Sequence, residues 1–241
     1  MRDFSRFEAM ADLYDRNYRH AVPFYDELHQ ILATTIGHVL SRQALVLDLG
    51  CGTGEIGRRS LTLVPEASWV LVDGSEAMLR RARAILMGRV RDALVGDFTG
   101  RDIWSQLKNL DAVVSSFAFH AIDDNEKRLV MENVANALKP GGIFLIGDLV
   151  KVKGNTEAMI YKSLVKENMD RSLKEGLLEP AFFEKEFHRK EGDSWEEMPA
   201  GLEEQLEWIS RAGLEPVLIW KYLGVALFGG VARESTAQRS N

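Results

Sequence analysis

Four residues at alternate positions, Asp48-x-Gly50-x-Gly52-x-Gly54, form a group that could bind a ligand. They overlap the end of a short apolar run, residues 45 to 49, and a helix-like pattern follows them. A buried strand that ends in a glycine-rich turn is how a doubly wound α/β sheet forms a nucleotide site, because glycine permits a tight turn and close approach to backbone N–H groups. A turn of this kind without a ligand is disfavoured, since unused glycines cost backbone entropy.

Two kinds of ligand fit this loop. Residues 52 to 57 match G-x-G-x-x-G, and Asp73 follows about twenty residues later, as in a dinucleotide-binding fingerprint. Asp48 argues against that interpretation, because its carboxylate at the strand end would lie beside a pyrophosphate of the same sign of charge. A ligand with a cationic amine or sulfonium at that point would instead be attracted.

Composition indicates one α/β domain over residues 1 to 241, of which 46% are apolar. No run approaches the ~18 apolar residues of a membrane span, and the first residues contain no apolar signal core, so we expect a cytoplasmic protein. The only cysteine, Cys51, excludes an internal disulfide and is better explained as a small residue in the tight turn than as a nucleophile. The net charge of −6 disfavours nucleic acid as a partner.

The full Asp-x-Gly-x-Gly-x-Gly string resembles motif I of the class I S-adenosylmethionine-dependent methyltransferases, and three further segments that resemble that family follow in order between roughly residues 9 and 231. The resemblance implies a Rossmann-like doubly wound sheet of seven strands in the order 3-2-1-4-5-7-6, with strand 7 antiparallel. It also implies S-adenosyl-L-methionine as cofactor and S-adenosyl-L-homocysteine as product.

Strand ends supply the expected cofactor residues. Strands are predicted at residues 69 to 73 and 90 to 95, and residues 111 to 122 are predicted to form a further strand and its exit; Asp73 ends the first where a ribose diol would lie. By resemblance, Asp97 and Phe98 meet the adenine, and residues 115 to 117 line the amino-acid end of the cofactor. The predicted cofactor-binding set is Asp48, Gly50, Cys51, Gly52, Gly54, Asp73, Gly74, Met78, Asp97, Phe98, Ser115, Ser116 and Tyr14.

One histidine is a catalytic candidate. His120 follows the strand at 111 to 116, so it would lie beside the transferable methyl group and could take a proton from an acceptor, or could shape the pocket by hydrogen bonding. Asp148 and Leu149 at the end of a strand at 143 to 148 can also face the substrate. The remaining histidines form no cluster with the spacing of metal ligands, so we expect no metal.

The remaining elements surround this sheet. Residues 4 to 40 are predicted to form two helices that cover the cofactor, separated by a break at 16 to 20; Tyr14 and Tyr18 are candidates to close the pocket. Helices are expected at 56 to 64, 126 to 138 and 199 to 212, the second closed by a turn at 139 to 142 and the third by Gly213. A helical lid at 151 to 198, a hairpin over 216 to 230 and a loose tail at 232 to 241 complete the chain.

The acceptor is less closely specified. Residues 151 to 207 contain 14 acidic and nine basic side chains, which makes phosphate-rich substrates unattractive and favours a small molecule with an O or N nucleophile. The overall plan is also similar to the carboxy-S-adenosylmethionine synthases of tRNA modification, but these need a cation for the added carboxylate, and the helix at 199 to 212 offers Glu204, Glu207 and Trp208. A non-catalytic cofactor-binding regulator is a third possibility, and a monomer or a homodimer is expected.

Overall fold

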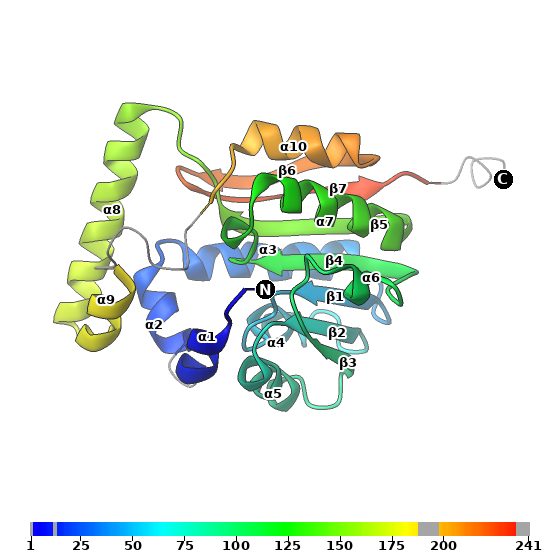
Figure 1. The fold of residues 1–241 in the computed structure, drawn as a ribbon, viewed down its shortest axis with the longest axis horizontal. Helices are drawn as coiled ribbons and strands as arrows, with labels where there is room; N and C mark the ends of the chain where they lie inside the picture. The colour runs from blue at the N-terminus through cyan, green and yellow to red at the C-terminus, as the bar shows by residue number, and fades with distance from the viewer. Residues whose placement is uncertain (1, 12–13, 188–197, 235–241) are drawn as a thin grey trace.

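The computed structural model describes residues 2–11, 14–187 and 198–234, which form a central sheet with helices on both faces (Figure 1). The strands are β1 (Leu45–Leu49), β2 (Ser68–Asp73), β3 (Val90–Val95), β4 (Leu110–Ser116), β5 (Leu138–Leu149), β6 (Leu214–Tyr222) and β7 (Val225–Ala232). The helices are α1 (Ser5–Met10), α2 (Tyr14–Ala21), α3 (Tyr25–Val39), α4 (Glu55–Ser60), α5 (Glu76–Ile85), α6 (Arg101–Trp104), α7 (Asp124–Ala137), α8 (Asn155–Lys174), α9 (Pro180–Phe187) and α10 (Leu202–Arg211), with one 3-10 turn, η1 (Phe119–Ala121).

The strand order is β3-β2-β1-β4-β5-β7-β6, as predicted. β1 pairs in parallel with both β2 and β4, so the chain reverses its direction of winding between β1 and β4. β7 runs antiparallel to β5 and to β6. In open α/β sheets a ligand binds outside the carboxyl ends of the strands at such a switch point. The Gly-rich loop after β1 lies there.

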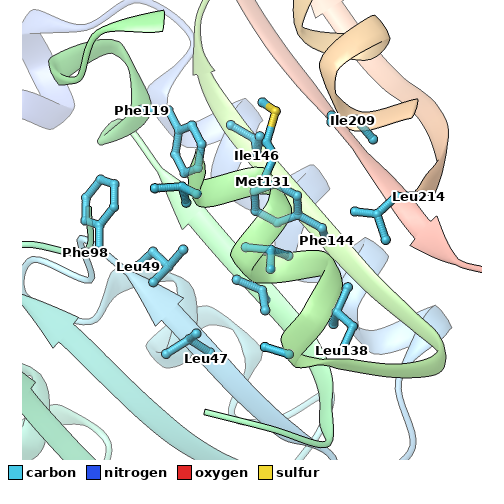
Figure 2. Close-up of a cluster of buried hydrophobic side chains, with 14 of the residues drawn as sticks. Leu47, Leu49, Phe98, Phe119, Met131, Leu138, Phe144, Ile146, Ile209 and Leu214 are labelled. Carbon is cyan, nitrogen blue, oxygen red and sulfur yellow. The ribbon is translucent and has the colours of Figure 1, made fainter. Parts of the chain in front are cut away.

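Side chains of β1 alternate between two cores. Leu47 and Leu49 point to the face covered by α6, α7 and α10, where Phe119, Phe144 and Met131 join them (Figure 2). Val46 belongs to the cluster on the other face, which α3, α4 and α5 cover with residues such as Leu32. Because successive strand residues face opposite sides, Asp48 points to the α3 side with Val46.

The prediction of two helices within residues 4 to 40 was wrong. There are three, and α2 runs through the predicted break at 16 to 20. α2 packs not on the sheet but against α8 and the turn after it: the buried Asn17 accepts a hydrogen bond from the backbone N–H of Glu179, and Ala21 is buried beside Met169. Tyr14, Tyr18 and Ala21 recur at helical spacing through the predicted break, and they belong to this small cluster rather than to the core of the sheet.

The segment predicted as a lid contains α8 and α9, joined by a short turn, and residues 188–197 lie outside the described residues. α8 and α9 lie beside α1 and α2 at one end of the sheet (Figure 1). Asn168 and Ser172 of α8 both donate to the carbonyl of His20 at the end of α2. The lid helices are therefore fixed to α2, and α2 in turn meets the Gly-rich loop.

Four element boundaries differ from prediction. The helix expected at 56 to 64 ends at Ser60, and turns follow it before Pro65. The turn at 139 to 142 is an irregular part of β5 rather than a separate connection, and the helix expected from residue 199 begins at Leu202. Ala232, the first residue of the predicted tail, pairs with Leu214 in the sheet, and residues 235–241 lie outside the described part. Within the described ranges, no helix combines the length and the apolar character needed to span a bilayer.

Candidate functional site

The loop after β1 depends on its glycines. Gly50, Gly52 and Gly54 have φ of 65°, 52° and 86°, the left-handed region that a side chain disfavours. A Cβ on Gly50 would also lie 2.6 Å from the Cβ of Ala118. Gly50 therefore lets the backbone pass close under the end of β4, and the loop folds back on the protein through the N–H groups of Cys51 and Gly54, which donate to the carbonyls of Val72 and Cys51.

Asp48 lies beneath this loop with its side chain fully buried. Neither carboxylate oxygen has a hydrogen-bond partner among the described residues. Burial, with a smaller contribution from the charge of Asp73, raises the pKa of Asp48 to about 8. A buried carboxyl group without a partner is costly, so its presence indicates a ligand that brings a positive charge or hydrogen-bond donors to this point.

Asp73 ends β2 and ties the loop to the next helix. One carboxylate oxygen accepts from the backbone N–H of Gly52 at 2.8 Å, and the other accepts from Ser75 at 2.9 Å. Burial raises the pKa of Asp73 although these hydrogen bonds oppose the shift. Ser75 caps α5 by accepting from the N–H of Met78.

Asp97 follows β3 and is half-buried. One oxygen accepts from both the backbone and the hydroxyl of Thr99, and the other accepts from Arg2 at 2.7 Å. Burial pushes the pKa of Asp97 upward, but these hydrogen bonds and the Arg2 charge outweigh it and hold the pKa below its usual value. Arg2 also pairs with Glu126, so this guanidinium lies between two carboxylates.

Two hollows adjoin at this edge of the sheet and share Tyr14, Gly50, Gly52 and Phe117 in their walls. Eleven of the thirteen predicted cofactor residues line them, namely Tyr14, Asp48, Gly50, Cys51, Gly52, Asp73, Gly74, Met78, Asp97, Phe98 and Ser116. The structure thus brings together residues that are up to about a hundred positions apart in the chain. Their roles toward a cofactor stay a prediction.

Two residues of the predicted set do not line the hollows. The hydroxyl of Ser115 is buried and donates to the carbonyl of Leu49, which joins β4 to β1. Gly54 precedes α4, and a Cβ there would lie 3.0 Å from the Cβ of Ala82. Both residues hold the scaffold of the loop in the arrangement described.

Tyr14 covers the loop from α2. Its ring stacks on Tyr18 with centroids 4.3 Å apart, and a Cβ on Gly52 would lie 4.0 Å from it. Beside it the hydroxyl of Thr53 donates to Asp15 at 2.5 Å. This bond joins α2 to the Gly-rich loop and supports the prediction that the N-terminal helices cover the site.

Several wall residues were missed by the sequence analysis. The ring of Phe4 lies so close to Gly74 that a Cβ there would come within 2.3 Å of it. Arg2, Phe7 and Tyr25 also line the hollows, as does His29, which was considered only as a metal ligand. No motif marks these positions, because they reach the site through the packing of α1 and α3.

His120 is held by Asp148. Its Nδ1 lies 2.6 Å from one carboxylate oxygen, and the other oxygen accepts from the backbone N–H groups of Ala118, Phe119 and His120. Ala118, Ala121 and Ile122 line the larger hollow, so His120 lies on the loop that forms its wall. Among the described residues, no group of three or more His, Cys, Asp or Glu side chains could hold a metal ion.

The helix in which a cation for an added carboxylate would be sought, α10, does not contribute Glu204, Glu207 or Trp208 to the walls of the two hollows. Glu204 accepts from the backbone of Gly201 at the start of α10, and Glu207 pairs with Arg211. Trp208 is buried on the far side of the sheet, with Arg128 over its ring. None of the three residues lines either hollow. The two glutamates therefore neither support nor exclude a substrate or cofactor with an added carboxylate.

Comparisons with known proteins agree with this geometry. A family model described as a methyltransferase domain matches residues 46–142. A carboxy-S-adenosyl-L-methionine synthase of Shewanella woodyi is 28% identical over 172 residues, 67% of this chain and 68% of that protein. Two further proteins of the same name are matched over 60% and 64% of their length, so the similarity spans about two thirds of these relatives.

Solved structures share the fold. A DhpI–SAH complex superposes with a TM-score of 0.64 at 19% identity, covering 95% of this chain and 94% of that one. An O-methyltransferase family protein from Burkholderia thailandensis gives a TM-score of 0.59 at 20% identity, over 96% of this chain and 59% of that one. These structures confirm the predicted fold, and the family model and the relatives confirm the predicted resemblance to S-adenosylmethionine-dependent methyltransferases.

Proposed function

We propose that this enzyme of the class I methyltransferase type transfers the methyl group of S-adenosyl-L-methionine to an O or N nucleophile of a small molecule. The observation that carries the proposal is Asp48, a fully buried carboxyl group without a hydrogen-bond partner among the described residues, beneath a glycine-rich loop at the switch point of the sheet. A cationic amino-acid moiety placed there would supply both charge and donors. A pyrophosphate would meet a buried acid instead.

The other wall residues fit the remaining parts of this cofactor. Asp48 and Ser116 would hold the ammonium group, and Asp73 at the end of β2 would accept from the ribose hydroxyls. Asp97 and Phe98 hold the adenine, for which Asp97 offers a carboxylate and Phe98 a ring. Tyr14 closes the cavity from α2. The cofactor supplies, when bound, an electrophilic methyl group on a sulfonium.

The protein's contribution to the reaction is alignment and exclusion of water. Tyr14, Tyr25 and Phe117 form an aromatic wall beside Asp48 and Ser116, and such a wall desolvates an incoming nucleophile. His120 removes the proton of the acceptor. Its Nδ1 lies within hydrogen-bond distance of Asp148, which fixes the orientation of the imidazole.

A second candidate is synthesis of carboxy-S-adenosylmethionine. The names of the relatives favour it, whereas the cavity offers little for an added carboxylate. Arg2 is the only Lys or Arg among the described residues that line the two hollows, and it already pairs with Asp97 and Glu126. We therefore place methyl transfer first.

Incubation with methyl-labelled S-adenosylmethionine and a panel of small phenols, carboxylates and amines tests the proposal. Labelled product from one acceptor class, with release of S-adenosylhomocysteine, is the expected result. A cofactor whose mass increases by a carboxylate group when α-keto or enol acids are present would establish the second candidate instead. Micromolar cofactor binding without turnover of any kind would identify a non-catalytic regulator.

A further inference from the structure

We infer that His29 is a positioning residue for the cofactor's amino group: it orients the hydroxyl of Ser116 so that this hydroxyl can only accept hydrogen bonds from the ligand. The inference rests on the proposed function and specifies how the cavity selects an ammonium group. It concerns a residue of α3, outside the strand-end motifs that define the rest of the site.

His29 spans the gap between α3 and the end of β4. Its side chain is buried and packs against the stacked rings of Tyr25 and Phe117, whose centroids lie 4.2 Å and 5.7 Å from the imidazole and 5.5 Å from each other. Ser116 lies two residues beyond Val114, which pairs with Asp48 across the β1–β4 ladder. Since alternate strand residues share a face, Val114, Ser116 and Asp48 all face α3.

The hydrogen bonds of His29 determine its tautomer. Nδ1 lies 2.8 Å from the backbone carbonyl of Tyr25, which can only accept, so Nδ1 carries a proton. Burial lowers the pKa of His29 to about 4, so the ring is neutral near pH 7 and Nε2 bears a lone pair. Nε2 lies 2.8 Å from the Ser116 hydroxyl oxygen. Ser116 must therefore donate its one proton to His29.

A hydroxyl whose one proton is donated in a hydrogen bond to His29 can only accept hydrogen bonds from other groups. The same corner of the cavity contains Asp48, an acceptor on both oxygens when ionised. Two acceptors of this kind suit a group with several N–H donors and a positive charge. They disfavour a hydroxyl, a carboxylate or hydrogen at the same position, because at least one buried acceptor would stay unpaired.

Packing alone does not account for a histidine here. A leucine or phenylalanine packed against Tyr25 and Phe117 would fill the space without burying two polar atoms, which are costly unless both are hydrogen-bonded. His38 gives a natural comparison in the same helix. Its Nδ1 makes the same bond, at 2.8 Å, to the carbonyl four residues earlier, but it is exposed and far from the cavity.

The test measures affinity by calorimetry for S-adenosylhomocysteine and for the same thioether without its α-amino group. Wild-type protein should prefer the amino compound by at least about tenfold, the scale of one hydrogen bond to a charged group. His29→Phe and Ser116→Ala should each reduce this preference to about threefold or less, and the double variant should lose no more than either single one. The control His38→Phe should keep the full preference.

Three results would overturn the inference. His29→Phe could weaken the binding of both compounds equally, which would be a structural effect. It could also keep the wild-type preference for the amino compound. Additive losses in the double variant would show that the two residues act separately. If His29→Phe does not fold, His29→Gln, whose amide oxygen can accept from Ser116, replaces it and must keep more of the preference than Ser116→Ala. Failure of wild type to bind either compound would instead overturn the proposed function.

Discussion

Asp148 binds His120 twice, once through the ring and once through the backbone. One carboxylate oxygen lies 2.6 Å from Nδ1 of His120, and the other accepts from its N–H at 3.1 Å and from two preceding N–H groups. The buried carboxylate thus fixes both the loop after β4 and the orientation of the imidazole on it. The proposed role as a general base requires an imidazole held in one orientation, and Asp148 provides that.

Replacement of His120 by Gln should lower kcat by about a hundredfold to ten-thousandfold, the usual contribution of a general base. Affinity for S-adenosylhomocysteine should stay within about threefold of wild type, because the cofactor walls are formed by other residues. Single-turnover kinetics together with calorimetry separate the two effects. Unchanged turnover in His120→Gln would assign this residue to shaping the loop only.

Lys127 clamps the far end of the lid segment to the same loop. Its buried ammonium group donates to the carbonyls of Ile122 and Met198, both at 2.6 Å, and lies 3.3 Å from Asp124. Lys127→Met should destabilise the protein by about 2–4 kcal/mol in urea unfolding, because buried carbonyls lose their donor. The control Lys139→Met removes a half-exposed pair with Asp111 and should cost below about 1 kcal/mol. Equal losses of unfolding free energy in the two variants would contradict this structural role of Lys127.

Gly229 tests the packing of the antiparallel strand. A Cβ there would lie 1.8 Å from the carbonyl oxygen of Phe144, a backbone atom of β5 that cannot move without disturbing the ladder. Gly229→Ala should therefore lower the free energy of unfolding by about 3 kcal/mol or more. Gly154→Ala, whose nearest neighbour would be 3.9 Å away, should change it by less than about 1 kcal/mol. A tolerated alanine at 229 would show that β5 and β7 pair differently.

Asp48 makes the stability of the ligand-free protein depend on pH. Its pKa is about 8 in the folded state against an ordinary value of 3.8, so between these limits the folded state holds a proton that the unfolded state has lost. The free energy of unfolding should fall as pH rises through this window, by up to ~1.4 kcal/mol per pH unit from this group. Denaturation at pH 5 and pH 8 should show a smaller decline for Asp48→Asn. An equal or larger decline would contradict the shifted pKa.

The sheet and most of the cavity could be predicted from the sequence because both depend on local signals. An apolar run that ends in Asp48 or Asp73 specifies a strand and a carboxylate at its end, and the resemblance orders these strands. The alternating glycines of the loop indicate a tight turn with positive φ angles, which the structure shows. Eleven predicted residues therefore line the two hollows.

The missed residues reach the cavity only through tertiary packing. His29 belongs to an amphipathic helix in which a buried polar ring cannot be distinguished from an apolar one by periodicity. Arg2 and Phe4 precede α1, and no local pattern predicts their contacts with Asp97 and Gly74. α2 was divided in error because its buried face meets α8, more than a hundred residues away in the chain.

The central claim is that Asp48 receives a cationic amino group, and proton-linked calorimetry tests it most directly. The ligand-free carboxyl has a pKa of about 8, so at pH 7 binding of S-adenosylmethionine should ionise it and release close to one proton. The proton count follows from the binding enthalpy in buffers of different ionisation enthalpy. Asp48→Asn should lose most of this release and bind about tenfold to a hundredfold more weakly. Wild-type affinity and an unchanged proton count in Asp48→Asn would contradict the claim.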